Sequence, residues 1–377
     1  MTSIKYAFIY LISGATLLAP VLGQSDELSY KDIPYTFEVT KLIAANNSFH
    51  FLRSFVDLFY LSYVENQAKF PIISSLKSET GWCVGDAHAE NFGVLLQDNG
   101  TPLFTMNDVD DSGPCPVTLD LFRLLVSTRL YDPSIDLEKL VHAYARGLKG
   151  EQFEMPLAIK EMMTKAERKG EGLSKKKESK GHLKRTPLME NVNPTERTQI
   201  LAALSHMRLS PGYEVLDMVS TSKVGGGSGG LLRYEVLLMN GDQHLQIEFK
   251  EEVKASIYPV APNLPNTKTR IEKTLFFNQG AGASRFYTVT KINEKDMFVR
   301  PRFSGNIGVS LKNQDADQNA EIIKYEAYTL GQIHAHSLER PKPLAHKLKE
   351  ISHSSIEAEV DTMTHYFQAK FDALKAK

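Results

Sequence analysis

The most informative stretch of this chain is Gly85-Asp86-Ala87-His88-Ala89-Glu90-Asn91-Phe92-Gly93. A short apolar segment precedes it and another follows, which indicates a polar turn between two short strands. The spacing of Asp86 and Asn91 suits phosphoryl transfer, in which an Asp accepts a hydroxyl proton while an Asn binds a metal ion. The alternative is a tight turn capped by Asp86 and Asn91, with His88 packed inside.

A hairpin follows this turn. We expect strands over residues 92–96 and 101–107, joined at Asp98-Asn99-Gly100. The returning strand ends in a run of carboxylates, from which Asp108 can meet Asn91 and complete a Mg²⁺ site, with Asp110 as a possible second ligand. A calcium loop is excluded because its closing position falls on Leu119, which has no side-chain oxygen. A charged turn remains an alternative.

A second constellation lies further along the chain. Between two predicted strands stand the residues Gly225, Gly226, Gly227, Ser228, Gly229 and Gly230. This placement fits a loop over nucleotide phosphates, because backbone amides approach phosphate closely only where side chains are missing; a flexible hairpin is the alternative. Lys250 ends the strand after the next hairpin, where a kinase places the Lys that pairs with phosphates. Glu272, on a helix predicted over residues 266–278, could orient it, although Glu251 and Glu252 are nearer in sequence.

The composition and the order of predicted elements indicate the fold class. The 377 residues carry a formal net charge of -1, which gives no reason to expect nucleic acid as a partner. A hydrophobic content of 42% is that of a globular protein. The order of predicted elements is helical, then strand-rich with one helix, then helical, so we expect an α+β protein. We expect a large lobe over residues 24–210, a small lobe over 211–303, and completion of the large lobe by 304–377.

The first 23 residues have the layout of a secretory signal peptide: Lys5, an apolar run, and small residues before Gln24. The alternative is an N-terminal membrane anchor. We expect export to the periplasm or beyond the cell, with no stable membrane span after cleavage. Export would permit a bond between Cys83 and Cys115, but the sequence leaves that bond open. The Lys-rich stretch 165–185 is either a solvated loop or a surface that attracts phosphate.

Taken in order, these motifs resemble the bacterial domain-of-unknown-function family 2252, which is grouped with the protein-kinase-like superfamily. The matching segments are residues 49–53, 85–93, 107–111, 120–124, 225–230, 249–251, 299–300 and 333–336. The catalytic block also resembles that of aminoglycoside and choline kinases, with matches at Asp86, His88, Asn91, Asp108 and Asp120. Their His two residues before the Asp is Val84 here.

The resemblance implies a circularly permuted, two-lobe kinase fold. In those kinases a helix ending in Leu-x-x-Leu-His precedes the catalytic loop, whereas here the similar segment, residues 330–334, lies near the C-terminus. It implies Mg²⁺-dependent phosphoryl transfer from ATP to an unknown acceptor. Asp86 would act as the base or orient the acceptor, Asn91 and Asp108 would hold Mg²⁺, and His88 would brace the loop.

Three alternatives stay open. The fold could serve nucleotidyl transfer, particularly since ATP is scarce outside the cytoplasm. It could be a non-catalytic module that binds a nucleotide or a partner, although such a module need not keep Asp86, Asn91, Asp108 and Lys250 together. An exported solute-binding or structural protein would leave the glycine run and the Asp clusters without a role.

Overall fold

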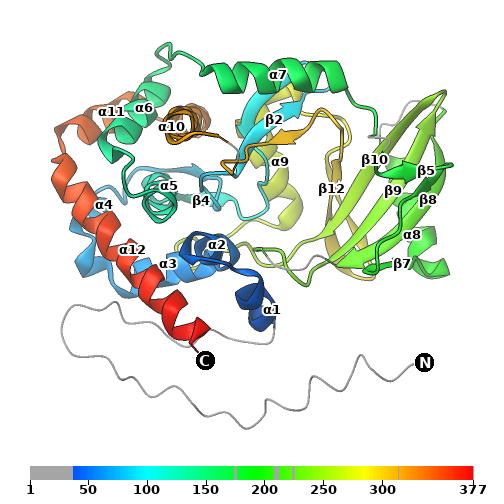
Figure 1. Ribbon diagram of the computed structural model, residues 1–377, viewed down its shortest axis with the longest axis horizontal. Helices are drawn as coiled ribbons and strands as arrows, with labels where there is room; N and C mark the ends of the chain where they lie inside the picture. Colours follow the sequence, from blue (N-terminus) through cyan, green and yellow to red (C-terminus); the bar gives the residue numbers. More distant parts are fainter. Residues whose placement is uncertain (1–36, 174–175, 208–211, 223–225, 313, 377) are drawn as a thin grey trace, which may run out of the picture.

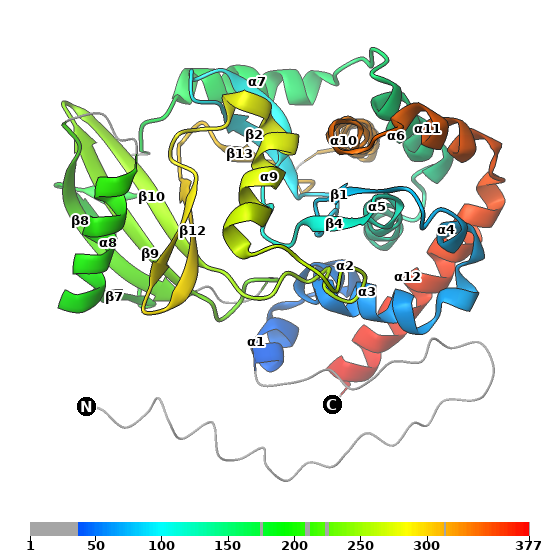
Figure 2. The same cartoon turned by 180° about the vertical axis from the view of Figure 1, so that it is seen from behind.

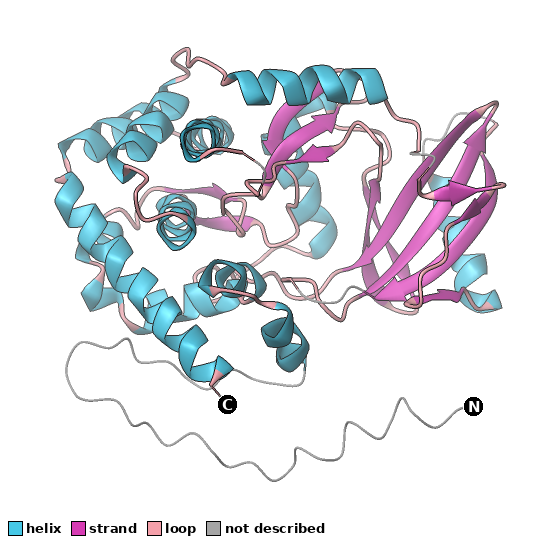
Figure 3. Ribbon diagram, in the orientation of Figure 1, coloured by secondary structure: helices cyan, strands magenta, loops and turns pink. Residues whose placement is uncertain are grey.

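The computed structural model describes residues 37–376, apart from 174–175, 208–211, 223–225 and 313. The predicted signal peptide, residues 1–23, and Gly225 therefore lie outside the described residues. The fold is α+β, as expected. A predominantly helical part adjoins a part built on a six-stranded antiparallel sheet (Figures 1 and 3).

The helical part contains chain segments from both ends of the described sequence. Its helices are α1 (Phe37–Ala44), α2 (Ser48–Ser54), α3 (Val56–Glu65), α4 (Pro71–Ser75), α5 (Thr118–Tyr131), α6 (Leu137–Lys149), α7 (Leu157–Lys169), α10 (Ala316–Ser337), α11 (Pro341–Glu350) and α12 (His353–Lys375). Helix α5 is buried continuously from Thr118 to Thr128, as expected of a helix enclosed on all sides. Asn47 caps the start of α2, and Phe55, which leaves helical geometry, separates α2 from α3.

Two small sheets carry the candidate catalytic segment. Strands β2 (Phe92–Leu96) and β3 (Pro102–Met106) form the predicted hairpin, and β13 (Ile307–Gly308) pairs with β2. Strand β1 (Thr80–Cys83) pairs with β4 (Gly113–Pro116). Pro114 and Pro116 both stand in this two-stranded pair, where a missing ladder donor is tolerated.

The large sheet has the order β11-β12-β10-β9-β8-β7. Its strands are β7 (Met189–Asn191), β8 (Glu214–Ser222), β9 (Leu232–Asn240), β10 (Gln243–Glu251), β11 (Thr288–Ile292) and β12 (Lys295–Pro301). Helix α8 (Pro194–His206) lies on the outer side of this sheet, and α9 (Thr267–Gln279) lies between the sheet and the helical part (Figure 2). The Lys-rich stretch is partly α7 and partly a short hairpin of β5 (Glu178–Ser179) and β6 (His182–Leu183).

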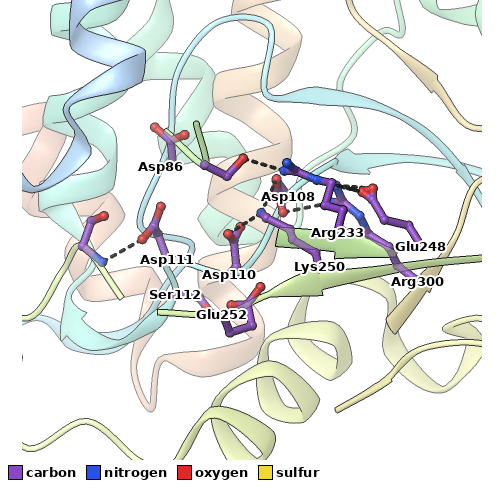
Figure 4. Close-up of polar contacts among 12 residues, drawn as sticks. Asp86, Asp108, Asp110, Asp111, Ser112, Arg233, Glu248, Lys250, Glu252 and Arg300 are labelled. Carbon is purple, nitrogen blue, oxygen red and sulfur yellow. Dashed lines mark hydrogen bonds and ion pairs between the residues drawn. The ribbon is translucent and has the colours of Figure 1, made fainter. Parts of the chain in front are cut away.

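Alternation along β10 sets the two faces of the sheet. Ile247 and Phe249 are fully buried in the apolar core, whereas Glu248 and Lys250 point the other way, as the two-residue period of a strand requires. In the ladder Lys250 lies opposite Phe298 of β12 and Arg233 of β9. The inner face is therefore charged and turned towards the carboxylates of the helical part (Figure 4).

A disulfide joins Cys83 of β1 to Cys115 of β4, with a Cα–Cα distance of 5.7 Å. The sequence permitted this bond without predicting it. The bond lies directly before the turn of residues 84–91. Trp82, the preceding residue of β1, donates its indole Nε1–H to Thr274 Oγ1 of α9 at 2.7 Å.

The two ends of the described chain pack together. The ring of Phe51 on α2 lies 6.0 Å from that of Phe367 and 5.9 Å from that of Phe371, both on α12. Ser48 Oγ donates to Gln368 Oε1 at 2.6 Å. Among the described helices, none combines the length and apolar character that crossing a membrane requires.

Candidate active site

The turn after β1 is held by a buried carboxylate beneath it. Asp120, at the start of α5, accepts the N–H groups of Val84 at 2.6 Å and Gly85 at 3.2 Å. Asp120 also contacts the Tyr60 hydroxyl at 3.3 Å and His334 Nε2 of α10 at 3.1 Å, and His334 Nδ1 lies 2.7 Å from the Tyr144 hydroxyl. Asp120 and His334 are fully buried, so this network fixes where the turn starts.

Gly85 is required by the same turn. Its φ is +87°, and a Cβ placed there would stand 2.0 Å from the carbonyl oxygen of Asp111. A glycine alone satisfies both conditions. The close approach brings the turn of residues 84–91 against the run of aspartates after β3.

Asp86 is ionised and tightly held. Burial raises its pKa, but His88 and Arg123 outweigh burial, and the pKa lies below its ordinary value. Arg123 Nη2 donates to Asp86 Oδ1 at 2.7 Å. The buried ring of His88 lies 3.5 Å from Asp86 Oδ2, and its Nδ1 lies 2.6 Å from the carbonyl oxygen of Ala89. Burial also lowers the pKa of His88, and its contacts with Asp86 and the Ala89 carbonyl oxygen brace the turn.

Asn91 stands across the turn from Asp86. Its Nδ2 donates to the Asp86 carbonyl oxygen at 2.9 Å, which leaves its amide oxygen for a ligand. The preceding residue, Glu90, has a φ of 80°, an uncommon conformation for a residue with a side chain. Two contacts hold it there: Arg53 Nη1 at 2.6 Å and the Leu311 N–H at 2.9 Å. No local pattern of the sequence indicates that Glu90 pairs with Arg53.

The aspartates after β3 meet the end of β10. Asp108 Oδ2 lies 3.0 Å from Lys250 Nζ, and Asp108 Oδ1 lies 3.0 Å from Arg300 Nη1 of β12. Asp110 also pairs with Lys250, and Asp111 Oδ1 accepts the Ser256 N–H at 2.7 Å. Figure 4 shows these carboxylates together with Asp86 around the tip of Lys250.

This crowding shifts the acidities of the group. Burial and the charge of Asp108 raise the pKa of Asp110 to about 7. Burial lowers the pKa of Lys250, but Asp108 and Asp110 outweigh it and the net shift is upward. The side chain of Lys250 is 1% exposed. Lys250 and Arg300 therefore stand among several carboxylates, a cluster of oxygen ligands that also suits a divalent ion.

The structure does not bring Glu272 to Lys250. Glu272 lies on the outer side of α9, with a side chain 56% exposed and 3.9 Å from Lys268. Two positions earlier, Arg270 faces inward: it pairs with Glu252 at 3.6 Å and donates to the carbonyl oxygens of Asp110 and Ser112. Because successive helix positions differ by about 100°, sequence alone could not fix which residue of α9 faces the site.

A buried glutamate of the large sheet, Glu248, pairs with three arginines. Glu248 lies 3.2 Å from Arg300, 3.4 Å from Arg233 and 3.8 Å from Arg302. Burial raises the pKa of Glu248, but these three guanidinium groups outweigh it and hold the pKa at about 2. Arg233 Nη2 also donates to Ser228 Oγ at 2.7 Å, which ties the glycine-rich turn to the sheet.

The described part of that turn, residues 226–230, lies over the carboxylates. Gly229 N donates to the Gly226 carbonyl oxygen at 2.9 Å. A Cβ on Gly227 would lie 3.4 Å from the carbonyl oxygen of Arg53, so the turn reaches the helical part. A cavity of about 510 Å³ is lined by residues 226–228 together with Asp86, Asn91, Asp108, Asp110 and Lys250. The structure thus gathers these predicted residues around one space.

A second cavity adjoins the first. It measures about 300 Å³ and is lined by Leu95, Lys177, Tyr287 and Arg300 among others. Asn91 and Asp108 line both cavities. Two spaces that meet at two candidate metal ligands can hold two reactants on either side of one ion.

A comparison with known families gives one match. The model of the family described as uncharacterized proteins conserved in bacteria, DUF2252, matches residues 39–143 and 160–373. No curated protein and no solved structure matches the chain.

Proposed function

This chain belongs to the DUF2252 family, and we propose that it is a magnesium-dependent phosphotransferase that moves a phosphoryl group from ATP to an acceptor. The observation that carries the proposal is the meeting of Asp86, Asn91, Asp108 and Lys250 at one cavity beneath a glycine-rich turn. These groups come from segments far apart in sequence, and each has a defined task in phosphoryl transfer.

The donor set fits Mg²⁺. The amide oxygen of Asn91 and the carboxylates of Asp108 and Asp110 are hard oxygen ligands, which Mg²⁺ prefers. Bound there, the ion supplies charge neutralisation to the phosphate oxygens. Since Lys250 pairs with Asp108 and Asp110 in this structure, we infer that it turns to the phosphates when a nucleotide binds.

Asp86 orients the acceptor rather than acting as a strong base. Its low pKa and its ion pair with Arg123 make it a weak proton acceptor, but its second oxygen is positioned to accept a hydroxyl hydrogen bond. The N–H groups of residues 226–230 would cover the phosphates. Catalysis then comes mainly from positioning and charge stabilisation.

Two contacts favour a circularly permuted kinase fold. His334 of α10 holds Asp120, which in turn holds the catalytic turn. Ser337 Oγ, at the end of α10, accepts the Trp82 N–H of β1 at 2.9 Å. The helix that carries residues 330–334 therefore lies directly before the catalytic segment in space, although it follows that segment in sequence.

Export by the N-terminal segment would place the protein where ATP is scarce, so the donor itself needs testing. The first experiment is a thermal-shift titration with ATP and Mg²⁺, followed by the other nucleoside triphosphates and inorganic polyphosphate. A ligand at 100 times its dissociation constant stabilises by about 2.7 kcal/mol, which is readily measured. Asp108→Ala should abolish a Mg²⁺-dependent shift.

The matched control is Asp296→Ala, since Asp296 is a partly exposed aspartate of β12 that pairs only weakly with Lys291, at 3.7 Å. That variant should retain the shift. Phosphate release and acceptor screening then separate the alternatives: tight binding without turnover supports a binding module, and pyrophosphate release supports nucleotidyl transfer. No shift with any donor would contradict the proposal.

A further inference from the structure

Three potential metal ligands meet at the edge of the helical part, and none of them lines either cavity of the candidate active site. They are Glu138 and His142 of α6 and His353, the first residue of α12. Glu138 and His142 are four residues apart, which places both side chains on one face of α6. His353 reaches them from a segment more than half the chain away.

The three side chains are already close. Their potential ligand atoms all lie within 4.8 Å of one another. His353 Nε2 is 3.4 Å from Glu138 Oε1, and the imidazole rings of His142 and His353 are 4.9 Å apart at an interplanar angle of 85°. His353 Nδ1 is buried without a hydrogen-bond partner among the described residues, so neighbouring protein groups do not fully account for the placement of this ring.

We propose that Glu138, His142 and His353 form a zinc site that fastens the start of α12 to α6. Two imidazoles and one carboxylate are a ligand set that zinc accepts, whereas Mg²⁺ and Ca²⁺ prefer oxygen ligands alone. Zinc–ligand bonds of about 2.0–2.1 Å in a tetrahedron place ligand atoms about 3.3 Å apart. The contact between His353 and Glu138 already has that length.

The remaining ligands can close by rotating side chains. Bringing atoms from within 4.8 Å to that spacing takes about 1 Å of movement per side chain, and Glu138, with a side chain 47% exposed, is free to turn. His142 also lines a cavity of about 1180 Å³ between α6, α7 and α10. This cavity gives solvent a route to the fourth coordination position, where a water molecule completes the tetrahedron.

The test uses untagged protein and Zn²⁺ alone. Competition with a chromophoric chelator should give one zinc ion per chain, and Co²⁺ substitution should give the visible absorption of a tetrahedral site. His142→Ala and His353→Ala should each weaken zinc binding at least tenfold. His365→Ala, an exposed histidine on the same helix α12, is the matched control and should leave zinc binding unchanged.

Glu138→Gln guards against misfolded variants, because it keeps the volume and both imidazoles while removing the anionic ligand. It should weaken zinc binding several-fold and leave the urea midpoint of the metal-free protein unchanged. Zinc affinity that is the same in the two histidine variants and the parent protein would overturn the proposal, as would half an ion per chain, which would indicate a site shared by two molecules. No step uses a nucleotide, so the result is independent of the proposed phosphotransferase activity.

Discussion

Removing the disulfide between Cys83 and Cys115 should lower the free energy of unfolding by about 4 kcal/mol. The bond closes a loop with a sequence separation of 32 residues, and the chain-entropy relation gives roughly this value for a loop of that length. Both sulfur atoms are buried between β1 and β4. Chemical reduction and substitution of the cysteines therefore break the bond with different effects on the packing of the core. Reduction keeps both sulfur atoms in the core, whereas Cys83→Ala with Cys115→Ala removes them.

Urea unfolding followed by tryptophan fluorescence is the assay. Trp82 is the single tryptophan and is 7% exposed beside Cys83, so its emission reports directly on this region. The reduced protein should lose about 4 kcal/mol, and the slope of free energy against urea should rise because the unfolded chain without the cross-link exposes more surface. A loss below about 1 kcal/mol, or a full loss with an unchanged slope, would refute an origin in the unfolded state.

Three further predictions concern the site. Glu248→Gln should lower the free energy of unfolding at pH 7 by about 3 kcal/mol, because the pKa of Glu248 falls from 4.5 to about 2 on folding. This contribution is complete above pH 4.5 and disappears as the pH falls towards 2. A difference in stability between variant and parent protein that stays the same from pH 6 to pH 2 in urea titrations would contradict the prediction. Gly85→Ala should cost more than about 2 kcal/mol, because its Cβ would collide with the Asp111 carbonyl oxygen, whereas Gly100→Ala has a similar φ of +79° in open space and should cost about 1 kcal/mol. Asp120→Asn should lower the free energy of unfolding by about 1.5–3 kcal/mol, because two backbone N–H groups lose their charged acceptor. Chemical unfolding measures the stability of the glycine variants and of Asp120→Asn. Equal costs for the two glycine variants, or an Asp120→Asn variant as stable as the parent protein, would be evidence against the reasoning.

Local patterns predicted the elements that carry the candidate site. The structure confirms the polar turn at residues 85–91, the hairpin after it and the strand that carries Lys250, which runs one residue further, to Glu251. Turn residues and strand alternation act over short distances, so the sequence predicts such elements well. Strand β4 was not predicted, since Pro114 and Pro116 normally end a strand. The ion pairs of Arg123 with Asp86 and of Arg300 with Asp108 join segments far apart in sequence, so no local pattern could reveal them.

The rotation of a helix about its axis also could not be predicted from the sequence. Helix α9 was predicted close to its observed bounds, yet the choice between Glu272 and Arg270 depends on how α9 packs against the segment after β3. The proposed zinc ligands could likewise be predicted only in part from the sequence. Glu138 and His142 have a visible four-residue spacing, but His353 joins them only through the packing of α12.

The contact between α2 and α12 bears on how the protein is made. Ser48 and Gln368 are separated by 320 residues, so the ribosome must synthesise α12 before α2 can meet this partner. Until then Phe51 lacks its aromatic partners Phe367 and Phe371 in the nascent chain. Late closure of such a long loop is slow. Newly synthesised chains should therefore depend on chaperones while this contact is still unmade.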